Sequence, residues 1–141
     1  MSSDSRRSLS KAALVAAFLA ATGNSLLYLI YYVTGIIPWS MLSPGRGVSI
    51  TPRLVFLVSI GGALGGTLLY AIIRRSASDP VRMFKLVAGV VLILSFIAPF
   101  LIDTFTPGLI LALDLMHVVV FAATVWALTV WMRPDKIRPS V

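Results

Sequence analysis

The sequence predicts an all-α fold: an integral membrane four-helix bundle with both termini in the cytoplasm. The composition leads to this prediction, because 58% of the residues are hydrophobic and 12% are charged, with a mean hydropathy of +0.96. Such values do not suit a domain with a hydrated surface. Four apolar segments each approach the roughly 20 residues that a helix needs to cross a bilayer core. Together with their short connections they use nearly the whole chain, so residues 1–141 are expected to form a single membrane domain.

The composition also excludes several functions. There is no cysteine, which rules out disulfide frameworks, thiol redox chemistry, cysteine-ligated zinc and iron–sulfur clusters. The net charge of +7 does not indicate nucleic acid binding. The Lys and Arg residues flank the apolar segments, and these positions indicate topology signals and contacts with anionic lipids at the cytoplasmic face. The sequence identifies no cofactor.

The first span is expected at about residues 12–34. The preceding SSDSRRSLSK resembles a twin-arginine export signal. The apolar character continues to Thr34, however, which is too far for a signal peptide and favours a permanent span. Small residues repeat at i+4 in its first half and offer a close-packing surface, and polar residues share one face of its second half. These two sets are Ala13, Ala17 and Ala21, then Asn24, Tyr28 and Tyr31.

Residues 35–53 form a loop rich in Gly, Pro and Ser, predicted outside, with Trp39 suited to the membrane interface. The second span follows at about residues 54–73 and contains SIGGALGG. A phosphate-binding loop is excluded, because no Lys-Ser or Lys-Thr follows these glycines. They instead make two small-xxx-small pairs, which indicate close helix packing within the bundle or between protomers of a homodimer. The pairs are Gly61 with Gly65 and Gly62 with Gly66.

Residues 74–85 read as a short charged turn, and the third span is expected at about residues 86–102. Pro99 cannot donate to the carbonyl four residues earlier, which predicts a kink near Ser95 or a polar notch facing a cavity. In the connection that follows, Thr106 is predicted to cap a helix that begins at Pro107. The fourth span is expected at about residues 109–132.

The distribution of basic residues predicts the orientation. Ten of the twelve Lys and Arg residues lie before the first span, between the second and third, or after the fourth. Only Arg46 and Arg53 lie in the other connections. The positive-inside rule therefore places both termini in the cytoplasm and the 35–53 loop outside.

The most informative stretch is LALDLMHVVVFAATVW, residues 111–126, which carries an aspartate and the only histidine of the chain. Asp114 and His117 are three residues apart, which puts them within reach of each other on one helix face. An intramembrane ionisable pair is a functional-site candidate by default. With the predicted topology, the polar side chains of all four spans fall in the outer half of the membrane.

We therefore expect a small polar pocket between the helices that opens outward, with the 35–53 loop over its mouth and Arg46 paired with Asp103. The candidate residues for ligand binding or proton relay are Asn24, Tyr28, Ser59, Ser95, Asp114 and His117.

Three interpretations of these polar residues stay open. They can hydrogen-bond one another across the bundle as polar glue, form a ligand or proton-relay site, or supply a metal or haem ligand through His117. The last has less support, because a single histidine provides a single ligand. Catalysis has the least, because no nucleophile stands beside the histidine in an evident motif, so no catalytic or metal-ligating residue is assigned.

Three short stretches resemble a family of small, uncharacterised four-span membrane proteins from bacteria, mainly actinobacteria, known only as a domain of unknown function. They are Asn24 with Leu26 and Tyr28, the SFIAP run that ends at Pro99, and LMHVVV around His117. The resemblance covers nearly the whole chain. It implies a four-helix fold and transfers no activity.

The sequence as a whole predicts a multi-pass protein of the bacterial plasma membrane. Its expected role is a non-enzymatic binding or accessory module for a small or lipidic ligand or a partner membrane protein. One alternative is a proton-coupled transporter or channel component that uses Asp114 and His117, for which this size implies a dimer. Another is a membrane-embedded enzyme at the outer leaflet.

Overall fold

The computed structural model describes residues 3–38, 50–102 and 105–131, and these residues form helices and connections without any strand. The helices are α1 (Ser3–Val33), α2 (Pro52–Ile73), α3 (Pro80–Ser95), α4 (Ile97–Phe100) and α5 (Pro107–Trp131). Counting α3 and α4 together, four helical stretches are long and apolar enough to cross a membrane. The predicted all-α class and four-helix bundle are confirmed. Trp39, Arg46 and Asp103 lie outside the described residues, and so do the predictions made for them.

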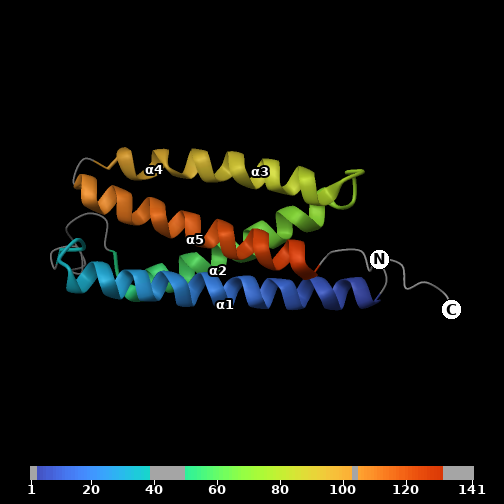
Figure 1. Ribbon diagram of the computed structural model, residues 1–141, viewed down its shortest axis with the longest axis horizontal. Coiled ribbons are helices and arrows are strands. Elements are labelled where there is room, and N and C mark those ends of the chain that lie inside the picture. The colour runs from blue at the N-terminus through green and yellow to red at the C-terminus, as the bar shows by residue number, and fades with distance from the viewer. Residues whose placement is uncertain (1–2, 39–49, 103–104, 132–141) are drawn as a thin grey trace.

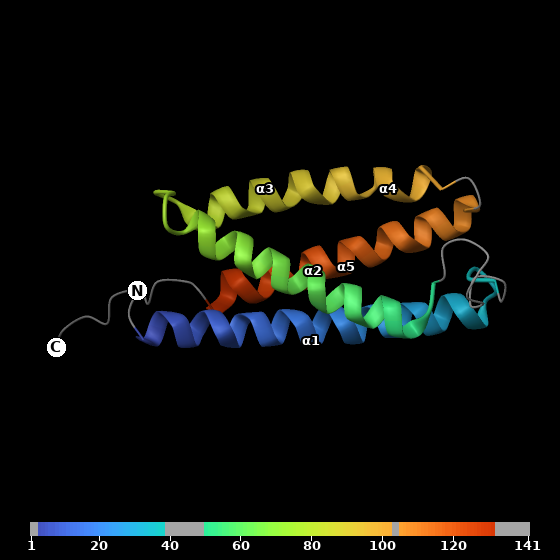
Figure 2. The same cartoon turned by 180° about the vertical axis from the view of Figure 1, so that it is seen from behind.

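The helices form three layers (Figure 1). α1 is one outer layer, α3 and α4 together are the other, and α2 and α5 cross each other between them, as the view from behind also shows (Figure 2). Within the described residues, α1 contacts α2 and α5 but not α3. The beginning of α1, the α2–α3 connection and the end of α5 lie at one end of the bundle.

Three helices begin in the same way, with a side-chain cap followed by proline. Thr51 accepts a hydrogen bond from the Leu54 N–H (3.2 Å), and Asp79 accepts one from the Arg82 N–H (3.1 Å). The predicted cap at Thr106 is confirmed by its bond from the Leu109 N–H (3.3 Å). In each case proline occupies the first helical position, where no N–H is needed.

The third apolar segment differs from the prediction at both of its ends. Helix α3 begins at Pro80, so much of the predicted charged turn is already helical because Asp79 caps it. α3 ends at Ser95, and after one non-helical residue the single turn α4 runs to Phe100. Pro99 lies in that turn and lacks the N–H that would bond the Ser95 carbonyl, which accounts for the break. The helix is therefore interrupted directly after Ser95, where the sequence predicted a kink.

Small side chains form the centre of the bundle. Ala16 and Ala20 of α1 pack against Ala63 of α2 and Ala127 of α5, and all four have no exposed surface. We call these four residues the alanine cluster. The buried row of α1 is Ala12, Ala16 and Ala20, not the predicted row one residue later, in which only Ala21 is buried. Both rows are all alanine, so periodicity alone did not decide between them.

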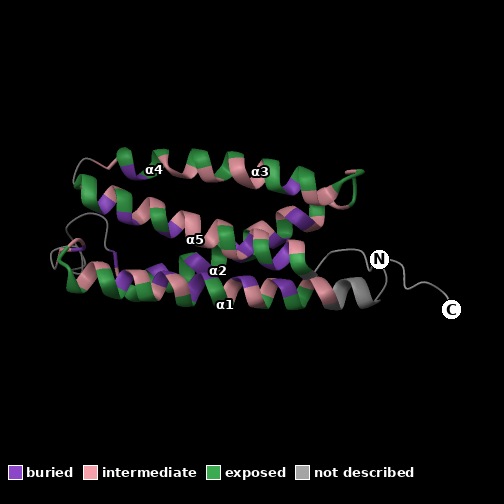
Figure 3. Ribbon diagram, in the orientation of Figure 1, coloured by how far each residue is buried: buried purple, intermediate pink, exposed green. Residues whose placement is uncertain are grey.

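The α3–α4 layer is held mainly at its two ends. Near its beginning, Phe84 packs edge-on against Tyr70 of α2, with ring centroids 5.4 Å apart. Near its other end, Pro99 is buried. Phe84 is the single buried residue of α3, and Figure 3 shows how little buried surface α3 and α4 carry compared with α1, α2 and α5.

Candidate functional site

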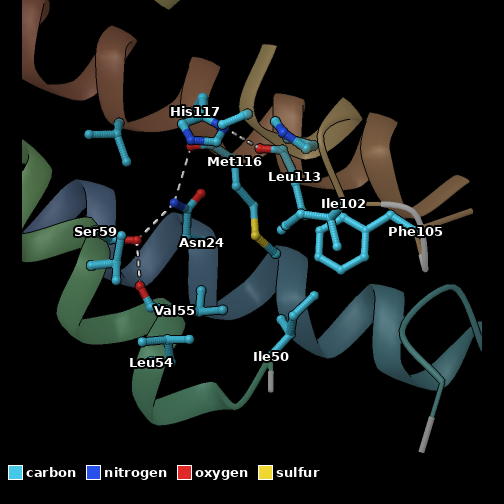
Figure 4. Close-up of a pocket in the computed structure, with 14 residues that line it drawn as sticks. Asn24, Ile50, Leu54, Val55, Ser59, Ile102, Phe105, Leu113, Met116 and His117 are labelled. Carbon is cyan, nitrogen blue, oxygen red and sulfur yellow. Dashed lines mark hydrogen bonds between the residues drawn. The ribbon is translucent and has the colours of Figure 1, made fainter. Parts of the chain in front are cut away.

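The side chain of Asn24 is 3% exposed and forms hydrogen bonds to two other helices inside the bundle. Its amide Nδ2 donates to Ser59 Oγ of α2 (2.8 Å) and to the Met116 carbonyl of α5 (3.2 Å). One side chain of α1 thus joins three helices, as Figure 4 shows. Hydrogen bonds of this kind between membrane helices contribute about 0.6 kcal/mol on average and up to about 1.7 kcal/mol.

The partners of Asn24 fix the orientation of its amide. The Met116 carbonyl can only accept, and the Ser59 hydroxyl already donates its proton to the Val55 carbonyl (2.7 Å). Nitrogen must therefore face both groups, which leaves the oxygen Oδ1 on the other side of the amide. Oδ1 is buried and has no hydrogen-bond partner among the described residues. An unpaired buried acceptor of this kind is uncommon in folded proteins.

His117 lies on α5 directly after the residue whose carbonyl Asn24 contacts. Its Nδ1 is 2.9 Å from the Leu113 carbonyl of its own helix. Because a carbonyl only accepts, Nδ1 carries a proton, and in the neutral ring Nε2 is then an acceptor. No hydrogen bond to Nε2 is present among the described residues.

Asp114 does not form the predicted pair with His117. The His117 ring turns to the Leu113 carbonyl instead, and Asp114 Oδ1 is buried without a hydrogen-bond partner among the described residues. An i, i+3 spacing permits contact but does not require it. Here the imidazole bonds the carbonyl four residues earlier on the same helix instead of the carboxylate.

The other two candidates are also separated from this contact. Tyr28 is buried, and its hydroxyl donates to the Ile50 carbonyl (3.2 Å) just before α2. Ser95 donates to the Leu92 carbonyl of its own helix (2.7 Å). The structure thus places Asn24, Ser59 and His117 around one cavity. Tyr28, Ser95 and Asp114 make no hydrogen bond to these three residues among the described residues.

Two adjoining cavities lie between the α3–α4 layer and helices α2 and α5. The first, of about 250 Å³, lies beside Asn24, Ser59, Pro99 and Met116. Asn24, Ser59, Met116 and His117 are among the residues that Figure 4 labels around it. The second, of about 380 Å³, is lined by α3 from Phe84 to Ser95 and by the facing sides of α2 and α5.

The two cavities share Val58, His117 and Val120, so His117 stands at their junction. We call the pair of cavities the α3 groove. Val58 and Val91, which line it, are 62% and 53% exposed, so the groove opens on the surface of the bundle. Its walls are almost entirely aliphatic and aromatic. Tyr28 and Asp114 line neither cavity.

The four glycines of α2 divide between two surroundings. A Cβ at Gly62 would lie 3.0 Å from a Val120 methyl, and one at Gly66 would lie 2.7 Å from the Thr124 methyl, so this pair faces α5 closely. A Cβ at Gly61 or Gly65 would meet nothing within 4 Å. Gly65 borders the second cavity, and Gly61 lines neither cavity.

Most of the groove wall carried no signal in the sequence. Phe84, Ala88 and Val91 face a cavity, yet an apolar residue beside a cavity looks the same in sequence as one beside lipid. Thr124 is another buried polar group of the second cavity, and its Oγ1 has no partner among the described residues. Thr124 lies seven residues after His117, a helical spacing that puts both on one face, and this spacing was the available signal.

The described residues of the groove wall offer hydrogen bonding and apolar contact. Within the described residues, no three His, Asp or Glu side chains gather into a group that holds a metal ion. The groove wall offers a single imidazole, a few hydroxyls and one amide, without the nucleophile and base arrangement of a covalent catalyst.

These features define a multi-pass α-helical membrane protein with cavities between its helices. The chain belongs to a family of unknown function (DUF6069), which matches residues 4–134. The resemblance to a domain-of-unknown-function family is thereby confirmed, and the bacterial origin stays a prediction. No curated protein matches the sequence. No solved structure matches it either.

Proposed function

We propose that this protein is a non-enzymatic membrane module that binds the apolar chain of a lipidic molecule in the α3 groove. The observation that carries the proposal is the pair of adjoining cavities, of about 250 and 380 Å³, which meet at His117 and open on the surface of the bundle. Ligand sites are typically mostly apolar hollows of a few hundred Å³ with a small number of placed polar groups. The α3 groove has this composition.

The packing of α3 supports a groove that admits a ligand. α3 is fixed near one end by Phe84, and the α4 turn at the other end by Pro99. Between these points the atoms that line the groove have no protein atoms on its open side, so they make fewer dispersion contacts there than in a filled groove. A hydrocarbon chain from the surrounding bilayer restores those contacts without displacing either anchor.

A proton-relay function has no comparable observation in its favour. The two side chains that it requires, Asp114 and His117, make no hydrogen bond to each other within the described residues. Only His117 borders the groove.

We further propose that both termini are cytoplasmic and that the membrane is the bacterial plasma membrane. Arg74, Arg75, Arg82 and Lys85 lie around the α2–α3 connection, at the end of the bundle where α1 begins. Arg53 lies at the other end, where α2 begins. The positive-inside rule favours the first end as cytoplasmic, which puts Asn24 and His117 in the outer half.

The absence of native cysteine makes this orientation directly testable by single-cysteine labelling. In intact cells, a membrane-impermeant maleimide is expected to label Arg53→Cys and to leave Ser78→Cys unlabelled until the cells are lysed. Labelling of Ser78→Cys in intact cells would reverse the proposed orientation.

Groove binding is tested with two matched glycine substitutions on α2. Both Gly65→Leu and Gly61→Leu enter open space, but only Gly65 borders the groove. Purified protein in detergent is titrated with cetyl methyl ether that carries a photoreactive diazirine and is then irradiated. We expect saturable labelling of the wild type and of Gly61→Leu, and its loss in Gly65→Leu. Equal labelling of the two variants would reject the groove as the binding site.

A further inference from the structure

We infer that the α3 groove selects a neutral lipid whose polar group is a hydroxyl, and that this hydroxyl donates a hydrogen bond to His117 Nε2. The inference rests on the proposed function and adds the chemical class of the ligand. It follows from which polar atoms of the groove wall already form hydrogen bonds within the protein and which do not.

The free nitrogen of His117 is an acceptor for a structural reason. The Leu113 carbonyl, 2.9 Å from Nδ1, can only accept, so a ring with one proton carries that proton on Nδ1. Nε2 therefore presents its lone pair, and a ligand that satisfies it must bring a proton. Because His117 borders both cavities, a chain lying in either cavity can place its polar end at this ring.

The neighbouring polar groups have the same character. Asn24, which lines the first cavity, donates its N–H groups to Ser59 and Met116, and its oxygen is buried without a hydrogen-bond partner among the described residues. Ser95 has spent its proton on the Leu92 carbonyl, so it too can only accept. Among the described residues of the groove wall, only Thr124, in the second cavity, keeps a free hydroxyl proton. The junction of the cavities thus favours a donor over an acceptor.

Charged headgroups do not fit this junction. In the part of the chain that the structure describes, no Lys, Arg, Asp or Glu lines either cavity, so a phosphate or carboxylate placed there would lose its hydration without a compensating cation. An amine cation would meet no carboxylate. A hydroxyl carries no charge to desolvate, and it supplies the proton that Nε2 lacks. A long-chain or prenyl alcohol is the simplest molecule with these properties.

The experiment compares three photoreactive probes with one chain: cetyl alcohol, cetyl methyl ether and palmitic acid. Chemical cleavage at methionine separates residues 42–83, 84–116 and 117–132 from residues 2–41, so label on α2, α3 and α5 is distinguished from label on α1. We expect the alcohol to reach half-saturation at an about threefold to tenfold lower concentration than the ether, the range for one hydrogen bond. Palmitic acid at neutral pH is expected to bind more weakly than the alcohol.

Variants of His117 assign the effect to the ring. In His117→Leu the alcohol and the ether are expected to become equal, with labelling by the ether retained. His117→Gln keeps an acceptor and is expected to restore part of the preference. Thr129→Val is the control on the same helix, because Thr129 bonds the Trp126 carbonyl and lines neither cavity, and its preference is expected to match the wild type.

The outcomes separate the two proposals. If alcohol and ether reach half-saturation at the same concentration in the wild type, the hydroxyl inference is overturned and groove binding stands. Stronger labelling by palmitic acid than by the alcohol would have the same two consequences. The hydroxyl inference also fails if His117→Leu folds, binds the ether and still prefers the alcohol. Absence of any saturable labelling on residues 42–132 would overturn the proposed function itself.

Discussion

The α2–α5 layer meets α1 on one side and α3 on the other, and the two interfaces differ in packing. Against α1, the alanine cluster has no exposed surface, and Asn24 adds hydrogen bonds to both partner helices. Against α3, two cavities remain, and Phe84 is the only residue of α3 that is buried.

The difference shows what holds helices together when the solvent is lipid. Burying an apolar side chain gains little where the surroundings are equally apolar, so close approach of backbones and shared hydrogen bonds decide which helices pack. α1 brings alanines to its interface. The face of α3 that lines the second cavity carries larger side chains, among them Phe84, Val91 and Leu92. Matched substitutions on the two sides test this account.

The largest difference is expected for Ala16→Leu against Ala88→Leu. Ala16 belongs to the alanine cluster, where a larger side chain finds no space, and overpacking of this kind costs about 1–3 kcal/mol. Ala88 faces the second cavity, so leucine there fills space and is expected to leave stability unchanged or raised. Thermal unfolding in detergent measures both. If the two variants unfold at the same temperature, the two interfaces do not differ in packing.

A smaller difference is expected for Gly66→Ala against Gly65→Ala. A methyl group at Gly66 would lie 2.7 Å from the Thr124 methyl, on a β-branched side chain with few rotamers. Gly65 faces open space, where alanine improves helix propensity by up to about 1 kcal/mol. We expect Gly66→Ala to unfold at a lower temperature than the wild type and Gly65→Ala at an equal or higher one. A stable Gly66→Ala would show that Thr124 turns aside.

The smallest difference is expected for Ser59→Ala against Ser95→Ala. Ser59 accepts from Asn24 across the α1–α2 interface, and its loss is expected to cost about 0.6 kcal/mol, the average for hydrogen bonds between membrane helices. Among the described residues, Ser95 bonds only its own helix, so Ser95→Ala is expected to unfold at the same temperature as the wild type. The same thermal assay applies, and a larger loss for Ser95→Ala would contradict the ranking.

Several features were readable from the sequence because they are local. The Thr106–Pro107 cap was predicted and is present. Thr51–Pro52 and Asp79–Pro80 carry the same signal, but the expected spans were placed by hydropathy, which marks residues that suit lipid and not residues that begin a helix. The interruption around Pro99 was likewise predicted from the missing N–H of one residue.

Other features depended on neighbours that the sequence does not reveal. Adjacent rows of alanine on α1, and adjacent glycine pairs on α2, look equivalent until the direction of the partner helix is known. The Asp114–His117 hydrogen bond is absent for a different and local reason, because His117 bonds the Leu113 carbonyl of its own helix instead.

The sequence by itself determined the four-helix membrane architecture, since hydropathy over about 20 residues and capping signals act within a single helix. The tertiary structure decided which polar residues share hydrogen bonds and that α3 stands away from α2 and α5. Those outcomes depend on how the faces of different helices meet, and faces of equal hydropathy differ only in shape. That is why the α3 groove, with His117 at its junction, appeared only in three dimensions.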